Sequence, residues 1–212
     1  MTKEIDFEKA VDGCFYKNDK NSTKIADFFI EKANENIARG SLMTNLKLQK
    51  LLYYSYVWKL VLNDEKIFND ELEAWEFGPV VRKEYTRLKK YENKPIEVKA
   101  IQTDINLLSK DLRGYLDTIW HSYGKYEASY LVEMTHNEKP WINTFNPNSN
   151  KKQIIKDSLI RDFYTIENAD ILLPENTVIR DLGNDNYELF ALNNETARAI
   201  NTPESEYKTF DL

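Results

Sequence analysis

The stretch NLKLQKLLYYSYVWKLVL, residues 45–62, places apolar side chains on almost every side of a predicted helix. A helix that is apolar all round is buried on all sides in a water-soluble protein, so we expect this segment to form the central core helix. Thr44 precedes it and can cap its first turn, because a threonine hydroxyl accepts a hydrogen bond from a free amide. The longest apolar run, residues 51–62, is too short to span a bilayer and is interrupted by Ser55 and Lys59, so no membrane span is predicted.

Two amphipathic patterns flank this segment. Upstream, Ser22 precedes apolar residues at helical spacing, and Gly40 can end that helix in a left-handed conformation. Downstream, Ser109 precedes apolar residues that recur at i, i+3, i+4, i+7, i+8 and i+11, and Gly124 follows as the predicted end. Both segments are therefore predicted to be helices with one buried face.

The remaining elements are shorter. Pro79 is placed at the first position of a helix, where its missing N–H costs nothing. The predicted elements are an extended segment at 72–77, a helix at 79–91, an edge strand at 96–99, a helix at 126–135, a turn-rich loop at 136–141, a helix after Asn150, and a β-hairpin of 177–180 with 187–192. We therefore predict a mainly α fold: a compact multi-helix domain with short β elements and a C-terminal β-hairpin.

The composition is that of an ordinary folded domain. The chain has 212 residues, of which 42% are hydrophobic, with 6 Gly, 6 Pro and one Cys. Cys14 has no second cysteine with which to form an intrachain disulfide or a cysteine-based zinc site, and the first residues run into charges without an apolar signal core. We therefore expect a cytoplasmic protein.

The formal charge of −6 is unevenly distributed. Residues 162–212 hold 11 acidic and 3 basic residues, whereas residues 1–161 hold 24 acidic and 26 basic residues. The seven basic residues within 82–99 suit either a phosphate-contacting patch or a solvated helix face. We favour the solvated face, because no helix-turn-helix or other DNA-reading segment accompanies it. Nucleic acid is therefore not expected as a partner.

No sequence pattern of a catalytic or cofactor site occurs in the chain. His121 and His136 lie fifteen positions apart without a zinc-binding motif, and a glycine-rich phosphate loop is absent. Glu71, Glu73 and Glu76 could act as general acids or bases, but their alternation with other residues is typical of a solvated strand. We therefore predict a protein that is not an enzyme and that uses no metal or cofactor.

The aromatic content is high, with 13 Tyr, 10 Phe and 4 Trp, and Tyr and Trp are favoured anchors at protein interfaces. Three rings fall on predicted apolar stripes and are expected in the core: Tyr56, Trp120 and Tyr123. Four lie beside charges or turns and suit either the core or an interface: Tyr54, Trp58, Trp75 and Trp141.

Three ordered motifs resemble the signature of the SocA-like, or Panacea, antitoxin domain. The runs LMTNLKLQKLLYY at 42–54 and EAWEFGPVV at 73–81 resemble its "LxKLQKLLYY … EAWxYGPV" pattern, with Tyr85 shortly after. The run THNEKPW at 135–141 resembles its third motif, "TH.e.PW". The one small departure is Phe77, which stands where the family usually has tyrosine.

The resemblance covers about residues 22–165. We therefore expect an N-terminal extension at 1–21, a SocA-like/Panacea helical domain at 22–165, and an acidic C-terminal extension with the hairpin at 166–212. The resemblance places the partner-binding or motif-supporting residues at Lys47, Gln49, Lys50, Tyr53, Tyr54, Trp75, Gly78, Pro79, Val80, Tyr85, His136 and Trp141.

The resemblance implies a helical antitoxin without known catalysis, which binds and neutralises a cognate toxin encoded beside it. Related proteins occur in phages and prophages, and one type of member delivers its toxin to a protease. The alternative is therefore a protease adaptor, or a phage-encoded counter-defence protein whose acidic extension binds a host target. A third reading is a hydrolase or metal enzyme centred on His136 and Glu138.

The motif residues can also be explained as architecture. Gly78-Pro79 would turn the chain into a helix, and Gln49 would hydrogen-bond a neighbouring backbone group from the buried helix. His136 would fix the loop that carries Trp141.

Overall fold

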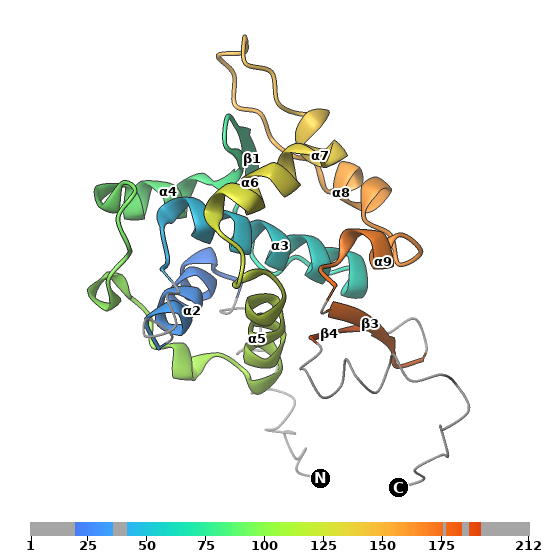
Figure 1. Ribbon diagram of the computed structural model, residues 1–212, viewed down its shortest axis with the longest axis horizontal. Coiled ribbons are helices and arrows are strands. Elements are labelled where there is room, and N and C mark those ends of the chain that lie inside the picture. The colour runs from blue at the N-terminus through green and yellow to red at the C-terminus, as the bar shows by residue number, and fades with distance from the viewer. Residues whose placement is uncertain (1–19, 36–41, 176, 184–186, 192–212) are drawn as a thin grey trace, which may run out of the picture.

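The computed structural model describes residues 20–35, 42–175, 177–183 and 187–191, and Figure 1 shows its helices gathered around one central helix, α3 (Asn45–Asn63). This is the predicted core helix, and fifteen of its residues are buried. The Thr44 hydroxyl caps it by accepting a hydrogen bond from the Lys47 amide at 3.3 Å. The sequence prediction of a central helix with a threonine cap is therefore confirmed.

The other helices pack around α3. In Figure 1, α2 (Ser22–Glu35) and α5 (Lys110–Tyr123) lie below α3, while α6 (Ala128–His136) and α7 (Lys139–Ile142) lie above it. The described residues also form the helices α4 (Arg82–Leu88), α8 (Asp157–Phe163) and α9 (Ala169–Leu172) and the 3₁₀ turns η2 (Lys89–Tyr91), η3 (Val98–Ala100) and η4 (Ile105–Leu107). None of the helices in these described residues is long and apolar enough to cross a membrane.

The predicted ends of α5 are confirmed. Ser109 Oγ accepts a hydrogen bond from the Leu112 amide at 3.2 Å, and the Gly124 amide donates to Trp120 O at 2.7 Å. A Cβ at position 124 would lie 2.5 Å from that carbonyl oxygen, so a side chain cannot be accommodated without movement of the backbone.

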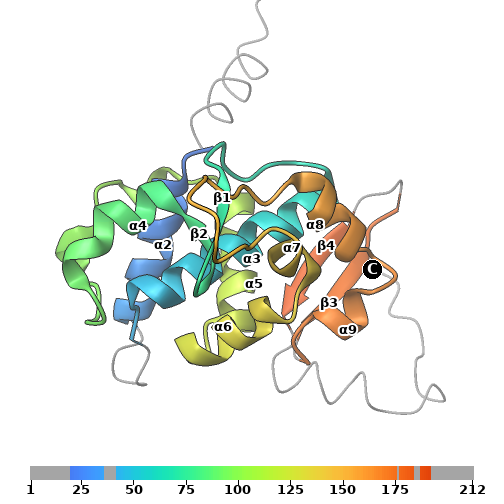
Figure 2. The ribbon, with the colours of Figure 1, turned by 90° about the horizontal axis from the view of Figure 1, so that it is seen from above.

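The strands form two separate hairpins. β1 (Leu72–Trp75) pairs antiparallel with β2 (Gly78–Val81), and β3 (Thr177–Asp181) pairs with β4 (Tyr187–Ala191). The second hairpin is the one predicted from the sequence. It packs on the helical core, because Leu189 is buried and Thr177 Oγ1 donates to Ser122 Oγ on α5 at 2.6 Å. Figure 2 shows this hairpin at the opposite side of the molecule from α4.

The prediction that Pro79 begins a helix is wrong. Residues 78–81 are the strand β2, and the helix begins only at Arg82. The Pro79 carbonyl accepts a hydrogen bond from Lys50 Nζ of α3 and so points away from β1. The N–H and C=O of one residue in a strand point to the same side, so the missing N–H of proline removes no bond to β1.

Three further local predictions are wrong. Residues 96–99 are not a strand: the Ile96 amide bonds to Met43 O at 2.7 Å, and η3 follows. The expected loop at 136–141 contains the one-turn helix α7. The helix expected after Asn150 begins only at Asp157, because the preceding residues extend the first hairpin: Ile154 bridges to Glu73 on β1. The predicted helix end at Gly40, and Cys14, lie outside the described residues.

A buried ionic network fixes α2 to α4. Arg87 Nη2 lies 2.8 Å from Asp27 Oδ1 and Arg87 Nε lies 2.7 Å from Glu84 Oε2, and both carboxylates are fully buried. Thr23 Oγ1 also donates to Glu84 at 2.7 Å. Arg87, one of the seven basic residues within 82–99, is thus a structural cation and not part of a solvated face.

Candidate functional site

The first two family-like motifs meet where α3 lies against the free edge of β2. Lys50 Nζ donates to Pro79 O at 3.2 Å, and the Val81 amide donates to Gln49 Oε1 at 2.9 Å. These two backbone groups point away from β1 and would otherwise be buried without partners, at a cost of about 1–3 kcal/mol each. Two adjacent side chains of α3 therefore complete the edge of the hairpin and fix its position on the core.

Gly78 lies at the closest approach of this hairpin to the core. Its φ of +93° belongs to the region that side chains rarely adopt. A Cβ at this position would lie 2.6 Å from Thr135 Oγ1 and closer still to Lys50 Nζ. Thr135 belongs to the third motif, so Gly78 is the point at which all three motifs come together.

The third motif also supplies a buried acid. Glu138 accepts a hydrogen bond from Tyr54 OH at 2.8 Å, and both side chains are buried, as is Lys50. The pKa of Glu138 is raised to about 7, and the main cause is burial. The opposing effects, which lower this pKa, come from the hydroxyls of Tyr164, Tyr54 and Tyr53 and from the charge of Lys50. Burial likewise lowers the pKa of Lys50 to about 7, with Glu138 opposing the shift.

Buried aromatic rings pack beside Glu138. Tyr54 stacks on Tyr123 with ring centroids 4.1 Å apart, and the hydroxyl of Tyr123 accepts a hydrogen bond from Trp58 Nε1 at 2.7 Å. The rings of Tyr54 and Trp58, which suited either the core or an interface from the sequence, are both fully buried. Lys50 and Glu138 therefore lie in the interior of the domain, largely shielded from solvent.

His136 and Trp141 hold the tip of the hairpin from the other side. Their rings stack at 4.1 Å and 19°, and Trp141 Nε1 donates to Trp75 O at 2.8 Å. Burial lowers the pKa of His136 below its usual value, and the Lys50 charge adds to the effect. His136 thus packs against Trp141, as expected, while the indole N–H of Trp141 fixes the end of β1.

The raised pKa of Glu138 predicts a pH dependence of stability. The folded state holds this proton more tightly than the unfolded state, so the contribution of Glu138 is present at low pH and is lost as pH rises toward 7. The unfolding free energy of the wild type relative to Glu138→Gln should therefore fall by about 2 kcal/mol between pH 5 and pH 7. Urea denaturation of both proteins at the two pH values measures this difference. A difference that stays the same at both pH values would contradict the raised pKa of Glu138. The titration of His136 does not affect the comparison, because both proteins retain this residue.

A groove of about 720 Å³ lies beside the hairpin. Its walls come from the amino end of α3, from the turn between β1 and β2, and from α4 with the residues after it. Trp75 and Tyr85 meet in its wall with ring centroids 4.8 Å apart at 64°. Phe77, at the tip of the hairpin, is 59% exposed although it is a large apolar side chain. The groove is lined by residues of the first two motifs together with Tyr85.

The expected site residues fall into three groups. Six are buried: Gln49, Lys50, Tyr53, Tyr54, Gly78 and Pro79. The groove is lined by three others, Trp75, Val80 and Tyr85, and also by the buried Gln49. His136 and Trp141 are half-buried behind the hairpin. Lys47 lies apart from them, because its Nζ donates to Gly124 O at 2.6 Å at the end of α5.

The interpretation of Glu73 as a solvated residue is wrong. Its side chain is buried, and Arg82 Nε donates to both of its carboxylate oxygens at 2.9 and 3.0 Å. Burial acts to raise the pKa of Glu73, but the bonds from Arg82 and from the indole of Trp75 lower it below its usual value. Glu73 therefore fixes the two strands of the hairpin and has no free carboxylate for catalysis.

Sequence reasoning missed several residues of this site. Glu138 was named only beside His136 in the alternative of a hydrolase or metal enzyme, and Thr135 stood in the third motif without a role. Tyr123 was expected only as a core residue, and Tyr164 belonged to no predicted pattern. Within the ranges that the structure describes, no three His, Cys, Asp or Glu side chains are grouped as metal ligands.

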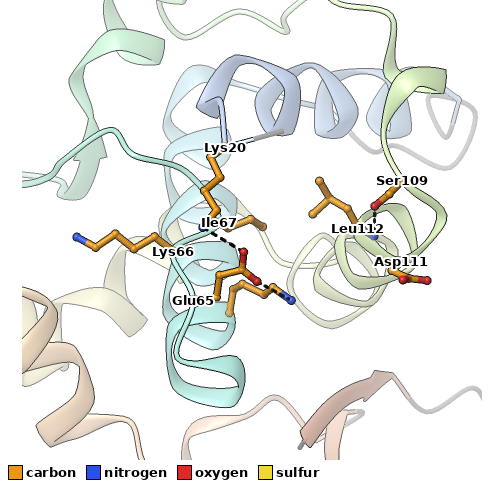
Figure 3. A pocket seen from close by; sticks show the side chains of 8 residues that line it. Lys20, Glu65, Lys66, Ile67, Ser109, Asp111 and Leu112 are labelled. Carbon is orange, nitrogen blue, oxygen red and sulfur yellow. Dashed lines mark hydrogen bonds and ion pairs between the residues drawn. The ribbon is translucent and has the colours of Figure 1, made fainter. Parts of the chain in front are cut away.

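A smaller pocket of about 90 Å³ lies between the segment after α3 and the start of α5 (Figure 3). Glu65 stands at its centre and pairs with Lys20 at 3.1 Å and with Lys59 at 3.7 Å. The pocket contains no residue of the three motifs. We therefore place the candidate functional site at the groove and not here.

Comparison with known proteins agrees with the motifs. Residues 48–142 match the family model described as "Antitoxin SocA-like, Panacea domain". The chain is 28% identical over 163 residues to Antitoxin SocA of Caulobacter vibrioides (strain NA1000 / CB15N), an alignment that covers 71% of this chain and 85% of the relative. No solved structure matches the chain.

Proposed function

We propose that the chain is a member of the SocA-like, Panacea-domain antitoxin family, whose model matches residues 48–142, and that it binds a cognate toxin and neutralises it by direct protein–protein contact. The observation that carries the proposal is the hairpin of β1 and β2. All three motifs fix it to the core, and it carries an exposed aromatic ring, Phe77, beside a groove. A rigidly held aromatic anchor at a groove is the usual centre of binding energy in a protein interface.

The proposal includes no catalytic step. Lys50 and Glu138, whose pKa values both shift to about 7, are buried and offer no path to a substrate. The side chains that do reach the groove are mainly aromatic, amide or aliphatic, which suits contact with a protein. Inhibition by occlusion of the toxin needs no more than such a surface.

Co-expression with the protein encoded in the adjacent reading frame tests the proposal. That protein alone should arrest growth, and the full chain should restore growth and co-purify with it as a complex. If the neighbouring protein is harmless alone, or if growth returns without a complex, the chain is not an antitoxin of this kind.

We assign the partner surface to the helical domain at 22–165 and not to the acidic extension. A chain that ends at Ala191 keeps the hairpin of β3 and β4, which packs on the core, and removes the residues beyond it. We expect this chain to neutralise the toxin as well as the full chain does. Loss of neutralisation would favour the alternative, in which the acidic extension binds the target.

A further inference from the structure

We propose that the groove beside the β1–β2 hairpin takes a cationic side chain of the toxin, an arginine or lysine that projects from a segment with apolar neighbours. The inference rests on the proposed function and adds to it the chemistry of the bound segment. It is carried by three features of the groove: its aromatic walls, its carboxylates and its amide floor.

Aromatic side chains line the walls of the groove. Trp75 and Tyr85 line it in an edge-to-face arrangement, and Phe77 also lines it. The face of an aromatic ring attracts a cation, most strongly in Trp, when the charge lies within about 6 Å of the centroid. Trp75 already holds one cation, because the Arg82 guanidinium lies 5.0 Å from its ring, and Arg82 lines a different hollow. The Trp75 ring therefore already contacts one cation of this chain. The rings of Tyr85 and Phe77 add further aromatic surface at the groove.

Carboxylates at the groove add the complementary charge. Glu76, on the hairpin turn, and Glu92, after η2, both line the groove and are exposed. Neither forms an ion pair with any residue in 20–35, 42–175, 177–183 or 187–191. Lys89 is the one basic residue among the lining residues in that part of the chain. The lining therefore carries an excess of negative charge and favours a basic partner group.

The floor of the groove is a pair of ordered amides. Gln49 Nε2 donates to Asn45 Oδ1 at 3.0 Å, and Asn45 Nδ2 donates to Tyr85 O at 3.1 Å. Both side chains are buried, so these bonds order the floor of the groove and fix the walls that receive the cationic side chain.

The opposite occupant, an acidic segment, is disfavoured by the same charges. Such a segment would gain Lys89 but would bring its carboxylates close to Glu76 and Glu92. Like charges placed together across an interface are unfavourable. The experiment below therefore includes an acidic peptide, and tighter binding of that peptide would favour an acidic segment.

The probes are three short peptides of sequence acetyl-Gly-X-Gly-amide in which X is Leu-Arg-Leu, Leu-citrulline-Leu or Leu-Glu-Leu. Citrulline has the shape of arginine without its charge. Each peptide is titrated into the full isotope-labelled chain, and the shifts of the Trp75 indole N–H and of the groove amides are followed by NMR. We expect the arginine peptide to shift these signals and to bind at least about 5-fold tighter than the citrulline peptide. Equal binding of the two, tighter binding of the glutamate peptide, or no shift with any peptide would overturn the proposal.

Matched variants locate the charge. Glu76→Gln combined with Glu92→Gln should remove the preference for arginine over citrulline. Glu175→Gln, the control, should keep the preference, because Glu175 is exposed just before β3, which lies on the opposite side of the molecule from α4 (Figure 2). A preference that survives in the double variant would show that the carboxylates do not select the cation.

Measurement of toxin binding by these variants distinguishes a failure of this inference from a failure of the proposed function. We expect the double variant to bind the toxin about 10-fold more weakly than the wild type and Glu175→Gln to bind it equally well. If wild type and double variant bind equally, the cation proposal fails while the antitoxin function stands. If the wild type binds no toxin, the proposed function itself fails.

Discussion

Gly78→Ala should lower the free energy of unfolding by about 3 kcal/mol, because it adds backbone strain to steric overlap. The residue has a φ of +93°, which costs an alanine about 1 kcal/mol. The new Cβ would lie 2.6 Å from Thr135 Oγ1 and closer to Lys50 Nζ, and overlap in a packed interior costs about 1–3 kcal/mol. Urea denaturation followed by circular dichroism measures the loss.

Gly114→Ala is the matched control. Gly114 lies within α5, and a Cβ there meets no atom within 4 Å. Alanine in a helix interior is favoured over glycine by about 1 kcal/mol, so this variant should be more stable than the wild type. Equal effects of the two substitutions would contradict the role of Gly78 as the contact point of the three motifs.

Lys50→Met should lower the unfolding free energy by about 2 kcal/mol at pH 7. Methionine fills the space of the lysine stem but removes the donor to Pro79 O, and a buried carbonyl oxygen that loses its donor costs about 1–3 kcal/mol. The substitution also removes the charge of Lys50, which lowers the pKa of Glu138.

A double-mutant cycle with Glu138→Gln tests the cause. Once the acid is neutral, the loss of the lysine charge should matter less, so Lys50→Met should cost at least about 1 kcal/mol less in the Glu138→Gln background than in the wild type. Additive effects would mean that Lys50 stabilises the hairpin without an energetic link to Glu138.

The sequence predicted the elements whose causes are local. The segment at 45–62 is apolar on all sides, and Thr44 precedes it, so the position of α3 follows from its own residues. The same holds for α5, where Ser109 and Gly124 mark both ends. The C-terminal hairpin was also predictable, since two β-prone runs flank a polar turn.

The errors came from contacts between distant residues. Pro79 matched a local rule for helix starts, but Gln49 and Lys50 of α3 bond the edge of this segment and hold it as a strand. Glu73 alternated like a solvated residue, but Arg82 and the strand pairing bury it. Such effects lie outside any local pattern.

The candidate site was predictable as a set of motifs but not as an arrangement. Tyr54 and Glu138 are 84 positions apart in the sequence and form one hydrogen bond. Periodicity places each residue on a helix or turn, but it gives no information on which of these elements meet. The motifs therefore indicated which residues matter, and only the structure separates those that support the hairpin from those that line the groove.

The central claim is that the hairpin presents an aromatic anchor to the toxin, and the most direct test is the dissociation constant of the toxin complex for the wild type, Phe77→Ala and Phe77→Tyr, measured by isothermal titration calorimetry. Phe77 is 59% exposed, so neither substitution should change the melting temperature appreciably. The account predicts that Phe77→Ala weakens binding about 30-fold, the effect of losing an interface hot spot, and that Phe77→Tyr binds like the wild type. Wild-type affinity in Phe77→Ala would contradict it.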